Sequence, residues 1–579
     1  MLLNDEQRAA VEYPGHCAIV ACPGAGKTRV LVEKTAHLVS TQSSARVLVV
    51  TFSRDAAAEV RARLAQRVPQ ALHRVDAQTF HALAMRHCLA TRLIDQFIGP
   101  AQQHALLNRA WKHAGDGMSW DTFIRAVEAR VSGMALAPPG PTFDACFDYY
   151  VELLDAHAAS DFGHLVVRSA QSIRAGTAPP IACSHILVDE AQDVDAPQLE
   201  WTLAHAERGA ISVLVGDDDQ SIFGFRGALG HAALDHAVRQ LDARLIRLQI
   251  NYRSNSEILG LAVRLIRHNT QRVAKELQAH RGPGGAVTLL PCHDSEREVE
   301  EIVERVRRHP HEWAILARSN FKLDDVERGL LSAGVPYVRP ESQDFWDSQG
   351  PALLLSLLAR RGALEPLTLG AVLAHVGVPE SDIRQVVHLD GPAPRRSGLD
   401  VATPKRIAAL ERCLAQLQGV EPDVAIRTAS QWLLEMAVDR RSVGPAIKAA
   451  TDVLLSLTGS LADRLRFVRL RRQLQTDGAV VLTTFHRAKG REWPRVIVCG
   501  LNEGLVPSRK AESIEEERRL LYVAMTRAES ELILTFPWEL VQEGAKVRRR
   551  VRAAPSRFLT ADLAIPLVRP AEADTIVHD

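Results

Sequence analysis

The most informative segment near the start of the chain is Ala21-Cys22-Pro23-Gly24-Ala25-Gly26-Lys27-Thr28. The apolar run Cys17–Ala21 leads into it, and the helical pattern Arg29–Val39 follows it. A strand, a glycine-rich turn ending in Gly-Lys-Thr and a helix make a P-loop, whose backbone N–H groups cradle phosphates. We therefore expect residues 22–28 to bind ATP, with Lys27 on the β- and γ-phosphates and the Thr28 hydroxyl on Mg²⁺. Because Ala21 stands where the usual pattern has glycine, a chance match is the alternative.

A second strand carries two acidic residues at its end, in Ile186-Leu187-Val188-Asp189-Glu190. We expect Asp189 to hold Mg²⁺ through water, and Glu190 to orient or deprotonate the attacking water. Acidic pairs at strand ends are often only solvated, but a buried strand ending in carboxylates is the natural partner of a P-loop.

Two arginines in the second half of the chain are candidates for contact with the γ-phosphate. Arg253 lies in Asn251-Tyr252-Arg253-Ser254, and Arg527 lies in Tyr522-Val523-Ala524-Met525-Thr526-Arg527-Ala528. A guanidinium fork suits a transferring phosphoryl group. An isolated arginine more often makes a surface salt bridge, so these roles depend on the surrounding strings.

The bulk composition indicates a large globular protein of several domains. The 579 residues are 46% hydrophobic and 24% charged, with a net charge of +1, so any nucleic-acid contact must come from local basic grooves. None of the eight cysteines forms a CxxC pair, which argues against a zinc ribbon or an iron–sulfur cluster. With neither a signal peptide nor a membrane-length apolar run, we expect a cytoplasmic protein without membrane contact.

Short, unbroken apolar runs predict parallel strands that are buried on both faces. They are Cys17–Ala21, Val47–Phe52, His185–Val188 and Ser212–Val215, then Ala286–Leu290, Trp313–Leu316, Ala479–Leu482, Arg495–Cys499 and Glu531–Leu534. Helical patterns such as Asp55–Val68 and Ser256–Arg267 lie between them, so βαβ units are the simplest assembly. The fold class is α/β with two parallel sheets.

Several strings together resemble the UvrD/Rep helicases of superfamily one. Besides the P-loop and the arginine strings, they are Leu3–Arg8, Asp189–Asp193, Val215–Ala228, Thr484–Pro494 and Glu516–Tyr522. The resemblance implies two RecA-like P-loop core domains with ATP in the cleft between them, each carrying a helical insertion. The first core would be residues 1–88 and 176–245 with an insertion at 89–175. The second would be 246–358 and 471–579, with a reduced insertion at 359–470.

The resemblance also assigns further nucleotide contacts. Gln7 would read the adenine edge, on which Tyr252 would stack, and Arg29 would support the phosphates. Glu492 would sit near the ribose and triphosphate, and Gln220 would sense the γ-phosphate and link hydrolysis to DNA movement. Lys27, Glu190 and Gln220 would then belong to one core, and Arg253 and Arg527 to the other.

Aromatic side chains beside these motifs predict a track for single-stranded DNA, because base stacking tolerates any sequence. The candidates are Phe52, Phe80, His81, Phe223, Phe225, Arg226 and His486. The alternative for each ring is a place in the core. The family commonly has Tyr and Trp where this chain has Phe223 and Phe225. The basic run Lys546–Arg552 is expected to be a loop that is either a DNA contact or merely solvated.

The resemblance implies an ATP-dependent DNA helicase or translocase that runs 3′→5′ and acts in DNA repair or recombination. Its partners would be single-stranded DNA, single/double-strand junctions, and repair or replication proteins, and it would work as a monomer. The second insertion has no convincing Gly-Ile-Gly string for duplex binding, so the motor could displace proteins without separating strands. One rival is a catalytically silent DNA-binding scaffold. Another is a RecB-type helicase–nuclease fusion, for which no nuclease-sized segment follows Leu559.

Overall fold

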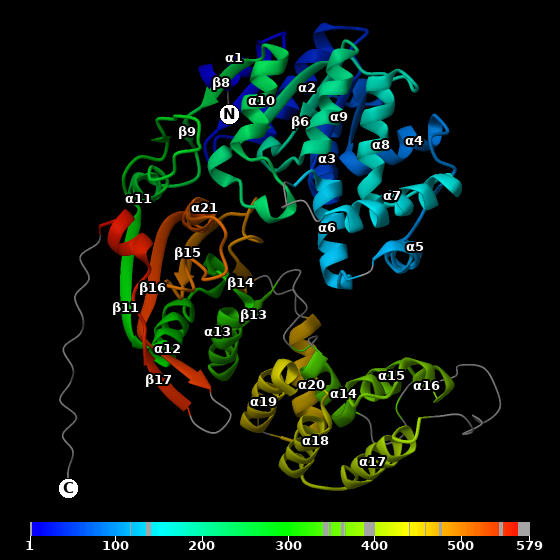
Figure 1. Ribbon diagram of the computed structural model, residues 1–579. Helices are drawn as coiled ribbons and strands as arrows, with labels where there is room; N and C mark the ends of the chain where they lie inside the picture. Colours follow the sequence, from blue (N-terminus) through cyan, green and yellow to red (C-terminus); the bar gives the residue numbers. More distant parts are fainter. Residues whose placement is uncertain are drawn as a thin grey trace.

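A computed structural model describes residues 3–115, 117–134, 140–339, 346, 349–359, 364, 366–386, 400–438, 440–457, 459–473, 478–543 and 548–564. Two parallel sheets form the two main bodies, with the first sheet at the top of Figure 1 and the second at the lower left. Among the described helices, none is both long and apolar enough to cross a bilayer.

The first sheet has six parallel strands in the order β3-β2-β6-β7-β1-β8. They are β1 (Cys17–Ala21), β2 (Val47–Thr51), β3 (Val75–Thr79), β6 (His185–Val188), β7 (Ile211–Gly216) and β8 (Arg244–Leu248). Alternate residues of the central strands face opposite sides: Ile19 packs with α1 (Asp5–Glu12), α2 (Lys27–Thr41) and α3 (Arg54–Arg67). Val20 packs on the other side with α4 (Phe80–Ala90), α8 (Phe162–Ala175), α9 (Ala196–Glu207) and α10 (His231–Leu241). Helices on both faces explain why these strands read as continuous apolar runs.

The second sheet follows the order β11-β16-β15-β12-β14-β13, with β17 antiparallel to β16. Its strands are β11 (Ala286–Asp294), β12 (Trp313–Ala317), β13 (Tyr337–Val338), β14 (Val480–Thr484), β15 (Trp493–Cys499), β16 (Ala528–Glu543) and β17 (Arg548–Arg552). One face packs with α11 (Ser256–Ile266) and α21 (Ile514–Met525), and the other with α12 (Ser295–Val306) and α13 (Asn320–Ser332). The two sheets confirm the predicted α/β fold class.

Two groups of helices accompany the sheets. The first comprises α5 (Pro100–Ala114), α6 (Trp120–Ser132) and α7 (Pro141–Ala156), beside the short pair β4 (Gln96–Phe97) and β5 (Ala159–Ser160), and has its own core. The second comprises α14 (Gln349–Ala359), α15 (Pro366–His375), α16 (Glu380–Val386), α17 (Thr403–Gln416), α18 (Pro422–Met436), α19 (Arg440–Ser456) and α20 (Leu461–Gln473). This second group forms the lower right of Figure 1.

The chain passes between the two sheets around the short parallel pair β9 (Ile250–Asn251) and β10 (Gln278–Ala279). On the first-sheet side, Asn251 Nδ2 donates to the Pro23 carbonyl at 2.6 Å. On the second-sheet side, the Asn255 N–H donates to the Glu529 carbonyl at 2.9 Å. The residues between them, Tyr252 to Ser254, therefore lie where the two bodies meet.

Candidate functional site

The P-loop has the backbone that phosphate binding needs. Gly24 and Gly26 adopt φ of +66° and +79°, and Gly26 begins α2 without a side-chain cap, so the first N–H groups of the helix stay available for an anion. A Cβ at Gly24 would lie 2.7 Å from the Arg253 Cβ, so the loop and the second-half arginine string are in close contact. Ala21 is the last residue of β1, where extended backbone does not require glycine.

Lys27 and the two carboxylates predicted to work with it lie together. Lys27 Nζ is 2.7 Å from Glu190 Oε2. Glu190 holds a left-handed backbone conformation with φ of 49°, an uncommon conformation that clusters at functional sites. Burial tends to raise the pKa of Glu190, but Lys27 and Lys489, together with the hydrogen bonds from Lys27 and Gln192, outweigh burial and lower the pKa to about 2. Burial, with Glu190 beside it, raises the pKa of Asp189 to about 7.

The expected adenine side lies against the same loop. Gln7 is buried, and its Nε2 donates to the Ala25 carbonyl at 3.0 Å. Asn4 caps α1 and donates through Nδ2 to the Tyr252 hydroxyl at 2.8 Å. His280 packs against Tyr252 with ring centroids 4.6 Å apart. These contacts place Gln7 and Tyr252 together beside the P-loop, and Arg29 lies in the first turn of α2.

The two predicted arginines lie where the second body contacts the first. Arg253 Nε lies 2.6 Å from Glu492 Oε2, so both predicted residues meet there. Arg527 is 1% exposed, and its Nη2 donates to Gln220 Oε1 at 2.9 Å. Burial lowers the pKa of Arg527 to about 9, which still leaves it charged at neutral pH.

Gln220 links the two bodies. Its Nε2 donates to Asp217 Oδ2 at 2.5 Å, and its backbone carbonyl accepts from Lys489 Nζ at 2.7 Å. Lys489 also pairs with Asp193 at 2.5 Å and lies over the Phe223 ring, 5.1 Å from its centroid. The residues predicted to bind ATP and the aromatic residues predicted to bind DNA are thus connected through Lys489. Sequence reasoning missed Lys489, although it lies within the quoted Thr484–Pro494 string.

Most of the predicted aromatic track is assembled. Phe52 stacks on Phe223 at 5.7 Å with 10° between the ring planes, and Phe223 and Phe225 lie 6.1 Å apart. His486 meets Phe225 edge-on at 5.7 Å, and the Arg226 guanidinium lies 5.5 Å from the Phe225 centroid. Phe52 and Phe225 are 42% and 56% exposed, so flat rings remain open to solvent.

The prediction that Phe80 contacts DNA is wrong. It is 3% exposed and packs edge-on against Trp201 at 5.7 Å, so its ring belongs to the core of the first sheet and cannot stack on a base. Its neighbour His81 instead stacks on the exposed Phe162 at 3.8 Å with 8° between planes. Phe162 was missed because it lies at the start of α8, 81 residues further along the chain than His81.

Both track histidines are neutral at physiological pH. Burial lowers the pKa of His81 to about 4. Burial, reinforced by Arg318 and other cations, lowers the pKa of His486 to about 4 as well. These rings can therefore stack or share a hydrogen bond, but they do not contribute the positive charge that attracts phosphate.

Two charged segments differ from their sequence appearance. Arg548–Arg552 forms strand β17 instead of a loop, while Lys546 and Val547 lie outside the described residues. Asp217, Asp218 and Asp219 bring their carboxylates within 4.8 Å of one another, as metal ligands do. However, Lys275 Nζ lies 2.7–2.9 Å from all three, so a protein cation already balances the cluster.

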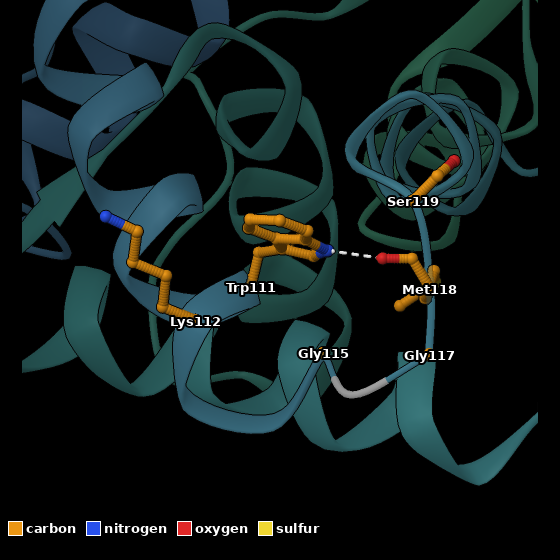
Figure 2. A pocket seen from close by; sticks show the side chains of 6 residues that line it. All are labelled: Trp111, Lys112, Gly115, Gly117, Met118 and Ser119. Carbon is orange, nitrogen blue, oxygen red and sulfur yellow. Dashed lines mark hydrogen bonds between the residues drawn. The ribbon is translucent and has the colours of Figure 1, made fainter.

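A cavity of about 470 Å³ opens between α5 and α6, away from this network. Figure 2 shows Trp111 donating through Nε1 to the Met118 carbonyl, at 2.8 Å. The indole N–H is therefore already used to hold the loop, and none of the predicted site residues lines this cavity.

The residues gathered around the P-loop fit ATP with Mg²⁺. Uncapped N–H groups begin α2, Lys27 and two arginines supply positive charge, and Thr28 and Asp189 offer oxygen atoms of the kind that Mg²⁺ prefers.

Comparison with known proteins supports the same interpretation. The family model of the UvrD/REP helicase N-terminal domain matches residues 3–94 and 131–237, and that of the UvrD-like helicase C-terminal domain matches 246–359 and 449–538. DNA helicase II of Escherichia coli (strain K12) is 29% identical, over 96% of this chain and 87% of that protein. ATP-dependent DNA helicase Rep of the same strain is 27% identical, over 96% and 94%. ATP-dependent DNA helicase PcrA of Leuconostoc citreum is 27% identical, over 98% and 86%.

Proposed function

Because this chain belongs to the UvrD/Rep family of helicases, we propose that it is an ATP-dependent DNA helicase or translocase that moves along single-stranded DNA. One observation carries the proposal: Gln220 of the first body accepts a hydrogen bond from Arg527 of the second body, and Gln220 lies only three residues before Phe223. A shift of Gln220 when the γ-phosphate is released would therefore be passed along a few backbone residues to the rings that would stack on bases.

In this proposal, Lys27, Arg29 and the backbone of residues 22–28 bind the phosphates, and Gln7 and Tyr252 bind the adenine. Thr28 and Asp189 hold Mg²⁺, which would neutralise phosphate charge when bound. Glu190 orients the attacking water. It must first release Lys27, since the two side chains now bond each other at 2.7 Å. Arg253 and Arg527 approach the γ-phosphate from the second body, while Glu492 faces the ribose side.

Hydrolysis is coupled to movement through the contacts between the bodies. Ile222 is fully buried in the core cluster of the second sheet, although its neighbours belong to the loop that follows β7. The Gly224 N–H also donates to Glu516 Oε1 at 3.1 Å. Any rotation of the second body therefore moves Phe223 and Phe225, which supports a motor in which the cleft and the track change together.

The DNA substrate is recognised by stacking. Phe52, Phe223 and Phe225 would take bases, with Phe162 and His81 as a second ring pair and Arg226 near a phosphate. Stacking contributes about 1–3 kcal/mol per base. The family commonly has Tyr and Trp at the positions of Phe223 and Phe225. Phenylalanine lacks their hydrogen-bonding groups but keeps the aromatic face on which a base can stack.

Further features are proposed from family membership. Residues 1–88 and 176–245 form the first core, although β8 continues to Leu248, and 246–358 with 471–579 form the second. Residues 89–175 and 359–470 form the insertions. The alignment with DNA helicase II extends over 656 positions, more than the 579 residues of this chain, so that relative carries segments that this chain lacks. A reduced second insertion favours single-strand translocation and protein displacement over extensive unwinding. We propose 3′→5′ movement, a monomeric motor and a role in DNA repair or recombination.

Steady-state ATP hydrolysis with and without oligo(dT) tests the proposal. We expect stimulation by single-stranded DNA, and a loss of about 10²-fold or more in Glu190→Gln with single-strand affinity unchanged. The scaffold alternative predicts equal background rates for both proteins. Unwinding of duplexes with a 3′ or a 5′ single-stranded tail tests the direction, and success from the 5′ tail alone would overturn it.

A further inference from the structure

A buried lysine occupies the centre of the Asp217–Asp219 cluster. Lys275 Nζ lies 2.8 Å from Asp217 Oδ1, 2.7 Å from Asp218 Oδ1 and 2.9 Å from Asp219 Oδ2, and its side chain has no exposed surface. Burial favours the neutral amine, but the three carboxylates outweigh it and raise the pKa of Lys275 well above its ordinary value. The ammonium is therefore a fixed positive charge inside the protein.

A second cation completes the cluster. Arg272 donates through Nε and Nη2 to the two oxygens of Asp219, at 2.8 and 2.7 Å. The Val273 N–H donates to Asp218 Oδ2 at 2.6 Å. The side chains of Arg272 and Lys275 and the backbone of Val273 thus bind the turn that follows β7, although they lie more than 50 residues further along the chain.

This turn also holds the side chain of Gln220. Asp217 uses one carboxylate oxygen for Lys275 and the other for Gln220 Nε2, at 2.8 and 2.5 Å. The Asp217 N–H donates to Gln192 Oε1 at 2.8 Å, and Gln192 Nε2 donates to Glu190 Oε2 at 2.5 Å. Asp217 therefore touches both the group that bonds Arg527 and the group that bonds Glu190.

We propose that Lys275 is a positioning residue of the hydrolytic site, which holds Asp217 so that its carboxylate fixes the side chain of Gln220 against Arg527. Without the ammonium, three buried carboxylates would repel one another, and Asp217 would turn away from Gln220 or take up a proton. The Lys275 side chain donates to the Ala21 carbonyl at 3.5 Å, one residue before the predicted phosphate-binding segment 22–28. It acts through Asp217. This inference rests on the proposed function.

A double-mutant cycle tests it. Lys275→Met alone leaves uncompensated buried charge, so the test variant is Lys275→Met with Asp218→Asn, which removes one charge of each sign. We expect kcat for DNA-stimulated hydrolysis to fall about 10- to 100-fold, with KM for ATP within about 3-fold of wild type. In a Gln220→Ala background, the same pair of substitutions should lower kcat by less than a further factor of about 3. Both sets of changes remove the same interaction, the hydrogen bond from Gln220 to Asp217. Asp217→Asn, a nearly isosteric change, should reproduce the kcat loss if the pair variant does not fold.

A binding measurement separates positioning from general damage. We expect each variant to keep its nucleotide-free affinity for oligo(dT), while the shift in that affinity on adding a non-hydrolysable ATP analogue falls toward zero. Three results would overturn the inference while leaving the motor intact. They are kcat losses of the pair variant and Gln220→Ala that multiply when combined, a change confined to KM, and an unchanged kcat in Asp217→Asn. A wild-type chain without DNA-stimulated hydrolysis would overturn the proposed function, and this inference with it.

Discussion

Replacing Arg527 by lysine should remove most ATP hydrolysis while keeping the positive charge. The guanidinium donates to the carbonyls of Val523 and Arg491 at 2.9 and 3.2 Å, and to Gln220 Oε1 at 2.9 Å. A lysine ammonium cannot span these directions, because its three donors leave from one atom. Loss of the Gln220 bond alone costs about 1.5–3 kcal/mol, or roughly 10- to 150-fold.

The proposed γ-phosphate contact raises that expectation. Arginines that stabilise a transferring phosphoryl group contribute about 10³- to 10⁵-fold to kcat. We therefore expect kcat of Arg527→Lys to fall by at least about 10³-fold, with KM for ATP changed much less. A coupled assay of ATP hydrolysis at saturating oligo(dT) measures both constants.

Arg518→Lys is the matched control. Arg518 lies on α21, which ends at Met525, two residues before Arg527. It is 8% exposed, and it donates to Asp562 Oδ2 and Asn269 Oδ1, both at 2.6 Å. It should lower the melting temperature as Arg527→Lys does, yet keep kcat within about 3-fold, since it loses the same type of bond away from Gln220. Equal kcat losses in the two variants, or a loss below about 10-fold in Arg527→Lys, would refute the reasoning.

Three further predictions concern the track, the loop and pH. Phe225→Ala should weaken oligo(dT) binding by about 1–3 kcal/mol in a fluorescence titration, whereas Phe80→Leu should lower only the melting temperature; the reverse pattern would contradict the track. Gly24→Ala forces a non-glycine residue to φ of +66° and a Cβ to 2.7 Å from a second-body arginine, so KM for ATP should rise at least about 10-fold, and an unchanged KM would contradict the loop geometry. Burial holds the pKa of His486 at about 4, below its ordinary value, so wild-type stability should decline as pH falls from 6.5 to 4. The free energy of unfolding, measured by denaturant titration at several pH values, should decline less with falling pH in His486→Gln than in wild type. Replacing the exposed His311 by glutamine should leave the decline unchanged. Equal pH dependence in the two variants would contradict this role of His486.

The buried strands of the first sheet could be predicted from the sequence, and its two edge strands could not. β1, β2, β6 and β7 are covered on both faces, so their residues form continuous apolar runs. β3 and β8 lie at the two edges of the first sheet and carry polar, partly exposed residues, as in Val75-Asp76-Ala77-Gln78-Thr79. Such a sequence has no run of apolar residues to mark a strand. β17 was missed for the same reason, since four of its five residues are arginine.

Site residues within short motifs could be predicted, and those that depend on long-range packing could not. Lys27 and Glu190 are 163 positions apart, but each lies in a recognisable string. Lys275 meets its three aspartates through a segment whose sequence has no periodicity or motif that indicates the contact. Phe80 lies in the right string, yet the direction of its ring depends on how α4 packs against Trp201.

Single-turnover translocation kinetics measure directional movement along single-stranded DNA. The protein is bound to oligo(dT) of increasing length, labelled with a fluorophore at either the 5′ or the 3′ end, and mixed with ATP, Mg²⁺ and a trap for free protein. For 3′→5′ movement, the time to peak signal at the 5′ label should grow linearly with oligonucleotide length, while the 3′ label shows no such lag and Glu190→Gln shows no peak. A signal that is independent of length at both ends would contradict it.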